Sequence, residues 1–140
     1  MFKRVLVPVC GETRGERTQK ALDKALQLCD GEIILLHVTE PIATVVGGEA
    51  RQELEAQSLA DGTAILSPII ERLQLDKRHF HSRVVPGTVA ETIVTIADQE
   101  DADLIVMYTD GRDDLSDMLL GTITERVLRN TMRNLLVVHT

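Results

Sequence analysis

Five short apolar runs recur along the chain, and a segment with helical spacing separates each run from the next. The runs are residues 5–9, 33–38, 79–85, 104–107 and 135–138. Most are apolar almost throughout, as expected for strands buried on both faces of a sheet, while the third alternates. Strands that alternate with helices indicate a parallel sheet covered on both faces, with right-handed crossovers. We therefore predict one α/β domain over residues 1–140, with an open, doubly wound, five-stranded parallel sheet and four helices.

The helical stripes occupy residues 21–29, 49–75, 89–97 and 121–128. Cys29 completes the first stripe, so we place it in a helix that Asp30-Gly31 ends. In the second stripe, Pro68 should kink the helix or start a second helical piece, because proline breaks the hydrogen-bond ladder.

Composition limits the function classes. The net charge of -7 disfavours nucleic acid and anionic membranes as partners. No apolar run approaches the roughly 18–20 residues of a transmembrane helix, and Met1-Phe2-Lys3-Arg4 does not read as a signal peptide. About 16 intervening residues, if helical, hold Cys10 and Cys29 roughly 24 Å apart, too far for a disulfide. We expect free thiols and a cytoplasmic protein.

In a doubly wound sheet, ligands bind beyond the carboxyl ends of the strands, where the strand order reverses. If the first strand is central and the fourth is its neighbour, two loops flank that crevice. One is Val9-Cys10-Gly11, and the other spans residues 108–122, with glycines and hydroxyl groups. We expect the ligand site between these loops.

Along nearly its whole length the chain resembles the universal stress protein family. The resemblance rests on residues 5–9, on 33–38 followed by Pro41, on Pro86-Gly87 with Glu91 and Ile93, and on 103–107 and 119–127. The last stretch, Leu-Leu-Gly-Thr-Ile-Thr-Glu-Arg-Val, is the most specific. The resemblance implies an adenine nucleotide alpha hydrolase-like fold with sheet order 3-2-1-4-5. It also implies a homodimer through the fifth strand, about Leu135 to His139.

Nucleotide-binding members of this family carry Gly, two residues, Gly, nine residues, then Gly followed by Ser or Thr. Here Gly111, Gly121 and Thr122 match, whereas Tyr108 replaces the first glycine and Cys10 replaces an Asp near the ribose. The resemblance implies that Gly111, Gly121, Thr122 and Thr124 hold phosphates. Val38 would offer its backbone to adenine, and Val9 and Cys10 would line the base and ribose, with Tyr108 in the pocket wall.

The phosphate site also has a physical basis. Glycine lets backbone N–H groups approach an anion closely, and Gly121-Thr122 opens a helix whose amino end attracts negative charge. An alternative stays open, because Thr122 and Glu125 also form a capping-box pattern.

Four carboxylates, Asp110, Asp113, Asp114 and Asp117, surround Arg112 in the second loop. They would repel a triphosphate unless Mg²⁺ accompanied it. A solvated acidic loop is the simpler interpretation, and we predict no metal site built by the protein itself.

Enzymatic motifs are absent from the sequence: there is no nucleophile elbow, P-loop or HExxH. His79 and His81 share one strand face but have no further ligands nearby in the sequence, so we predict an ordinary strand face. No general base is evident, so any ATP hydrolysis should be slow. Two hypotheses remain: a non-catalytic module that binds ATP or another adenine nucleotide in sensing or regulation, and a dimeric interaction module that has lost nucleotide binding.

Overall fold

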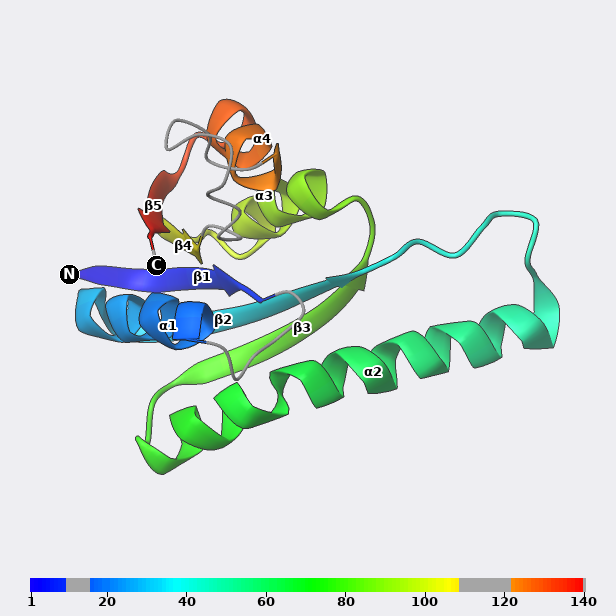
Figure 1. Ribbon diagram of the computed structural model, residues 1–140, viewed down its shortest axis with the longest axis horizontal. Coiled ribbons are helices and arrows are strands. Elements are labelled where there is room, and N and C mark those ends of the chain that lie inside the picture. The colour runs from blue at the N-terminus through cyan, green and yellow to red at the C-terminus, as the bar shows by residue number, and fades with distance from the viewer. Residues whose placement is uncertain (10–15, 109–121, 140) are drawn as a thin grey trace.

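The computed structural model describes residues 1–9, 16–108 and 122–139, and all of its strands are parallel members of one sheet. The sheet order is β3-β2-β1-β4-β5, as the family resemblance implied (Figure 1). The strands are β1 (Phe2–Pro8), β2 (Cys29–Thr39), β3 (Phe80–Pro86), β4 (Leu104–Tyr108) and β5 (Asn134–Val138). The predicted fold is confirmed.

Within the described residues, four helices cover the two faces of the sheet: α1 (Glu16–Leu28), α2 (Gly48–Leu75), α3 (Val89–Gln99) and α4 (Thr122–Asn130). Helices α1 and α2 lie on one face, and α3 and α4 lie on the other (Figure 1). Strand order reverses beside β1, because the chain crosses from β3 at one edge to β4 on the far side of β1.

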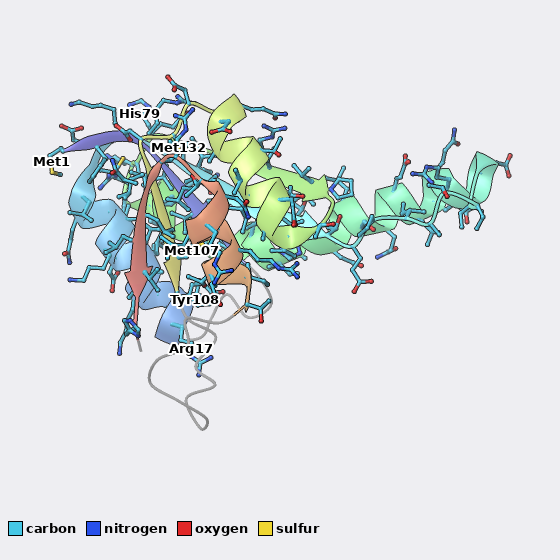
Figure 2. All side chains as sticks on the ribbon, turned by 90° about the horizontal axis from the view of Figure 1, so that it is seen from above. Met1, Arg17, His79, Met107, Tyr108 and Met132 are labelled. Atoms are coloured by element: carbon cyan, nitrogen blue, oxygen red, sulfur yellow. The ribbon has the colours of Figure 1, made fainter. Side chains whose placement is uncertain are left out.

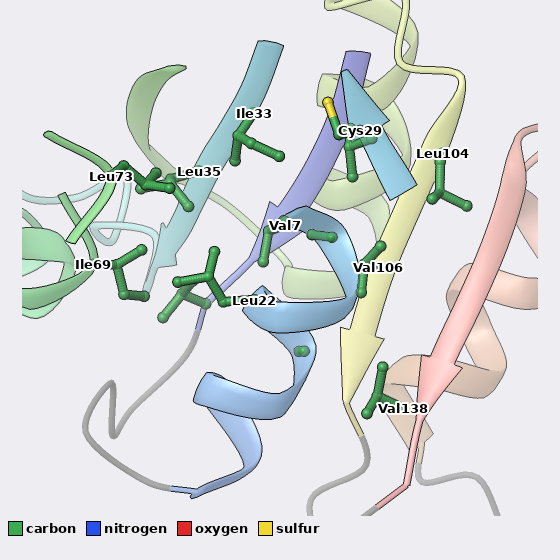
Figure 3. Packing of buried hydrophobic residues seen from close by; sticks show 14 of the residues in the cluster. Val7, Leu22, Cys29, Ile33, Leu35, Ile69, Leu73, Leu104, Val106 and Val138 are labelled. Carbon is green, nitrogen blue, oxygen red and sulfur yellow. The ribbon is translucent and has the colours of Figure 1, made fainter. Parts of the chain in front are cut away.

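The core is divided by the sheet into two layers. Val5 and Val7 contribute to the layer under α1 and α2, whereas Leu6 contributes to the layer under α3 and α4. Successive strand residues point to opposite faces, so a strand buried on both sides must be apolar at every position. Figure 3 shows the first layer, in which Leu22 of α1 and Ile69 of α2 lie against Leu35.

The predicted placement of Cys29 in a helix is wrong, and one of the two alternatives for Pro68 is excluded. Cys29 is the first residue of β2 rather than a helical residue, since β2 begins directly after α1 ends at Leu28. Its buried Sγ lies 3.5 Å from the Glu32 carbonyl, and Cys10 falls outside the described residues. Helix α2 continues through Pro68, so no second helical piece begins there, and the alternative of a kink stays a prediction. Leu66 and Ile69 on either side of Pro68 are buried in the core.

Only the second half of α2 is embedded in the fold. All four of its buried residues, Gly62, Leu66, Ile69 and Leu73, lie in that half, while the first half projects past the sheet (Figure 1). Over the described ranges, we find no helix with both the length and the apolar character needed to span a membrane.

Candidate functional site at the carboxyl ends of the strands

A crevice opens beside the carboxyl end of β1, and Pro8 accounts for its position. The Val9 N–H donates to the Leu36 carbonyl of β2 at 2.7 Å, so Val9 faces β2 and Pro8 faces β4. Proline has no N–H to give to that side. Pairing of β1 with β4 extends only to Leu6–Ile105, whereas pairing with β2 continues to Pro8–Leu36. The two central strands therefore separate where the sheet order reverses.

The floor of the crevice is apolar and is built from both central strands and two helices. Its lining residues are Pro8, Val9, Leu36, Val38, Val89, Ile93, Met107, Tyr108 and Ile123. The cavity that these residues enclose measures about 30 Å³, which is room for a water molecule, so a base would have to lie over this floor and not within it. An apolar floor of this kind suits the face of an aromatic base.

The structure brings Val9, Val38 and Tyr108, three of the residues that we predicted, together on this floor. Thr122 begins α4 and is exposed, whereas Thr124 is only 4% exposed and lies in the interior. The predicted residues Cys10, Gly111 and Gly121 lie outside the described residues. The ligand-binding roles of all eight residues remain predictions.

Tyr108 borders the crevice and packs mainly toward the first core layer. Its side chain is half-buried against the cluster under α1 and α2, while neighbouring Met107 belongs to the cluster under α3 and α4. Figure 2 labels both side chains at the carboxyl end of β4. The phenol ring thus contributes one wall, and the α3 and α4 side of the floor is left to Val89, Ile93 and Ile123.

The first turn of α4 brings a helix amino end next to the apolar floor. Thr122 is the first helical residue, and Ile123, which follows it, lines the crevice. Glu125 pairs with Arg129 at 2.6 Å. The capping box of Thr122 and Glu125 stays a prediction. The amino end of the helix provides positive partial charge beside the floor.

His37 is a site residue that the sequence reasoning missed. It is a 9% exposed residue within an otherwise apolar part of β2, and its Nδ1 lies 2.8 Å from the Val9 carbonyl. The sequence did contain an indication of this contact, because a histidine in a strand buried on both faces needs a polar partner. Val89 and Ile93 were also missed, since only the tertiary arrangement shows that the start of α3 borders the crevice.

A second group of polar residues lies toward the amino ends of the strands, away from the crevice. His81 of β3 places Nδ1 3.0 Å from Glu32 and Nε2 2.9 Å from Glu100. Arg4 pairs with both carboxylates, at 2.8 Å from Glu32 and 3.0 Å from Glu100, and Arg83 reaches Glu100 at 3.3 Å. These five residues form an ionic cluster.

The cluster shifts the pKa values of His81, Glu32 and Glu100. Partial burial alone would lower the pKa of His81, but hydrogen bonds to Glu32 and Glu100 outweigh it and raise the pKa above the ordinary 6.5. The hydrogen bond from His81 lowers the pKa of Glu32. Burial opposes a shift at Glu100, yet His81 and Arg83 lower that pKa as well. Within residues 1–9, 16–108 and 122–139 no group of His, Cys, Asp and Glu is arranged to hold a metal ion.

Comparison with known proteins places this fold and crevice in a family. The profile of the universal stress protein family matches residues 1–139. A universal stress protein of Methanocaldococcus jannaschii is 30% identical over 99% of this chain and 82% of its own length. A relative from Methanothermobacter thermautotrophicus is 30% identical over 91% of this chain and 89% of its own length.

Solved structures agree with these sequence matches. A Methanocaldococcus jannaschii protein, solved to assign its biochemical function, superposes with a TM-score of 0.76 at 27% identity, covering 100% of this chain and 97% of its own. An Arabidopsis thaliana family protein with AMP bound has a TM-score of 0.69 at 16% identity, covering 98% and 91%. A universal stress protein in complex with cAMP has a TM-score of 0.71 at 22% identity, covering 99% and 98%. With a matching sequence profile, matching relatives and the same sheet, this chain belongs to the universal stress protein family.

Proposed function

We propose that the protein binds an adenine nucleotide at the carboxyl-end crevice and works as a sensing or regulatory module. The observation that carries the proposal is the apolar floor at the strand-order reversal, which lies directly beside the first turn of α4. A base can pack on the floor while phosphates reach the helix amino end. Family members with bound AMP and cAMP support the same ligand class.

In this arrangement the base lies against Val9, with the Val38 backbone at its edge and Cys10 on the ribose side. The phosphates meet Gly111, Gly121 and the hydroxyl of the exposed Thr122, and the hydroxyl of the buried Thr124 joins them only if binding uncovers it. ATP would bring Mg²⁺ with it, because the acidic loop from Asp110 to Asp117 otherwise repels a triphosphate.

Efficient catalysis is not part of the proposal. The described residues that line the crevice are apolar apart from Tyr108, and none of them is a carboxylate or a histidine. A general base has to lie within hydrogen-bond reach of the proton that it removes. We expect at most slow ATP hydrolysis.

A second candidate is a dimeric interaction module that no longer binds nucleotide. The observation that favours it is Tyr108, a bulky residue in the crevice wall where nucleotide-binding relatives have glycine. The replacement of the ribose-side Asp by Cys10 also favours a loss of nucleotide binding, because a thiol is a weaker hydrogen-bond acceptor than a carboxylate.

One experiment separates the two candidates. The purified protein is denatured and released nucleotide is identified by chromatography, and the melting temperature is then measured with AMP and with Mg-ATP. A ligand at 100 times its Kd adds about 2.7 kcal/mol of stability. Neither release nor a melting shift would favour the interaction module.

A matched pair of variants tests the phosphate site. Gly121→Val should abolish the nucleotide-dependent melting shift, because a branched side chain blocks the close approach of an anion to the backbone. Gly47→Val is the control, since a Cβ at Gly47 meets nothing within 4 Å. Nucleotide binding that survives in Gly121→Val would reject this phosphate site.

A further inference from the structure

Backbone pairing between β1 and β2 stops at the edge of the crevice, where a hydrogen bond from a side chain replaces the next backbone bond. The last pair in register is Pro8–Leu36, and the last backbone bond runs from Val9 to the Leu36 carbonyl at 2.7 Å. In a regular parallel ladder the next bond would join the Val38 N–H to the Val9 carbonyl. In the described part of these two strands, the Val9 carbonyl is instead bonded to Nδ1 of His37 at 2.8 Å.

The Val38 backbone is consequently directed at the crevice. Residues along a parallel strand present their N–H and C=O groups alternately to one neighbouring strand and the other. The Leu36 carbonyl accepts from β1, and the Thr39 carbonyl accepts from Gly87 at the end of β3. Val38 therefore faces the β1 side, beyond the last paired residue, and it lines the crevice floor.

The ring of His37 is fixed from two sides. A carbonyl oxygen can only accept a hydrogen bond, so Nδ1 carries the proton. On the other side, α2 approaches so closely that a Cβ on Gly62 would lie 3.1 Å from Cδ2 of His37 and 2.5 Å from Val84. The ring therefore lies between the Val9 carbonyl and helix α2.

We propose that His37 is a positioning residue for the nucleotide base. By holding the Val9 carbonyl it ends the β1–β2 ladder one bond early, which keeps the Val38 N–H and C=O open to hydrogen-bond the edge of the base. His37 does not touch the ligand and acts through Val9. The inference rests on the proposed function and adds to it the residue that prepares the base-binding edge.

The test compares two His37 variants in AMP titrations followed by calorimetry and amide NMR. His37→Leu removes the donor, and AMP binding should weaken about tenfold, the loss of roughly one hydrogen-bonded contact. His37→Asn keeps an N–H near the position of Nδ1 and should bind within about threefold of the wild type. Val84→Ala loosens the same α2 packing without touching Val9, and it should bind AMP like the wild type.

The outcome for Asn distinguishes positioning from structural support. If His37→Leu, His37→Asn and Val84→Ala all lose affinity in proportion to their loss of stability, His37 only supports the core and the inference is wrong. Wild-type affinity in His37→Leu would also overturn it, with the proposed function left intact.

The bond between His37 and the Val9 carbonyl can also be tested in ligand-free protein. Failure of AMP and ATP to bind would contradict the proposed function but would leave this test possible. The Val38 amide hydrogen should exchange faster than the Val9 amide hydrogen in the wild type. It should gain protection in His37→Leu, as the ladder closes onto the released Val9 carbonyl. Slow exchange at Val38 in the wild type, or histidine NMR that shows Nδ1 without its proton, contradicts the inference.

Discussion

At the residue scale, Gly31 lets β2 run close to β1 at the start of the sheet. A Cβ at Gly31 would lie 2.1 Å from the Lys3 carbonyl oxygen, which is backbone and cannot move aside. Gly31→Ala should therefore lower the free energy of unfolding by about 1–3 kcal/mol, the usual range for overpacking. Urea denaturation followed by circular dichroism measures the change.

The control for Gly31 is another glycine with open space around it. A Cβ at Gly47 meets nothing within 4 Å, and Gly47 has an extended backbone with φ -138. Gly47→Ala should cost less than about 1 kcal/mol, the effect of a poorer helix cap. If Gly31→Ala and Gly47→Ala lose equal free energy of unfolding, contact of the new Cβ with the Lys3 carbonyl is not what destabilises Gly31→Ala.

The ionic cluster around His81 makes stability depend on pH. Because folding raises the pKa of His81 above 6.5, its contribution is fully present below pH 6.5 and is lost as pH rises through the folded pKa. Folding lowers the pKa values of Glu32 and Glu100 below 4.5, so their contribution is present above pH 4.5 and is lost as pH falls through the folded values. The cluster should stabilise the fold most between these limits.

Denaturation of the wild type and of His81→Asn across pH 4 to 9 tests this dependence. The stability difference between them should be largest near pH 5–6 and should shrink at higher pH. His79→Asn, at an exposed neighbouring position, is the control. A difference that stays constant as pH rises from 6 to 9 would mean that His81 contributes by packing and not by charge.

At the scale of elements, the end of α2 contains a residue in an unfavourable conformation. Lys77 has φ 55, and its N–H bonds to the Gln74 carbonyl at 3.1 Å in the turn that closes the helix. Left-handed backbone costs a residue with a Cβ about 1–2 kcal/mol, whereas glycine adopts it freely at a smaller cost in unfolded-chain entropy. Lys77→Gly should raise the stability by about 0.5–1 kcal/mol.

Asp76 provides the matched comparison for Lys77. It is the preceding residue and has ordinary helical angles, φ -80 and ψ 0. Asp76→Gly should lower the stability by at least about 0.5–1 kcal/mol, because glycine adds freedom to the unfolded chain there and the substitution also removes the 3.9 Å ion pair of Asp76 with Arg72. Thermal melts of both variants measure the two changes in stability, which should have opposite signs. A loss of stability in both variants would contradict the prediction.

The elements themselves could be predicted wherever local pattern and tertiary packing agree. The continuous apolar runs around Val7 and Leu35 identify strands buried on both faces, which led to the correct fold class. The start of β2 at Cys29 was not predictable, because helical spacing includes that residue and only pairing with Phe2 places it in the sheet. Helix α2 passes through Pro68 because core packing of Leu66 and Ile69 outweighs the lost hydrogen bond.

The crevice was predictable only in part, for a similar reason. Val9 and Val38 end strands that the sequence pattern identifies, so the family resemblance could assign them to a site. His37 acts through a bond to a residue 28 positions earlier, and Ile93 reaches the crevice from another layer. No local pattern encodes either arrangement.

At the scale of the whole molecule, the crevice and the ionic cluster lie at opposite ends of one sheet. The crevice opens where the strands end, near Tyr108, and the ionic cluster lies toward the end where Met1 and His79 are found (Figure 2). Substitutions in the cluster should therefore alter stability and leave nucleotide affinity unchanged. This separation makes the His81 variants suitable as stability controls for variants in the crevice.

The molecule also has an edge that we propose is covered by a second copy. Strand β5 is the last strand of the sheet, and an uncovered edge strand offers unpaired backbone groups. Val137 is half-buried in this strand, yet among the described residues it belongs to neither core cluster. We expect a homodimer through β5, with Val137 close to its counterpart, because a two-fold axis sets the same surface against itself.

Sedimentation at several concentrations tests the homodimer, with Val137→Lys as the disrupting variant. Two lysines facing each other across the two-fold axis repel, so the variant should sediment as a folded monomer where the wild type is a dimer. Val45→Lys introduces the same charge at a valine that is 92% exposed, in the loop before α2, and should remain dimeric. A wild type that is monomeric at high concentration, or a Val137→Lys variant that stays dimeric, would remove β5 as the interface.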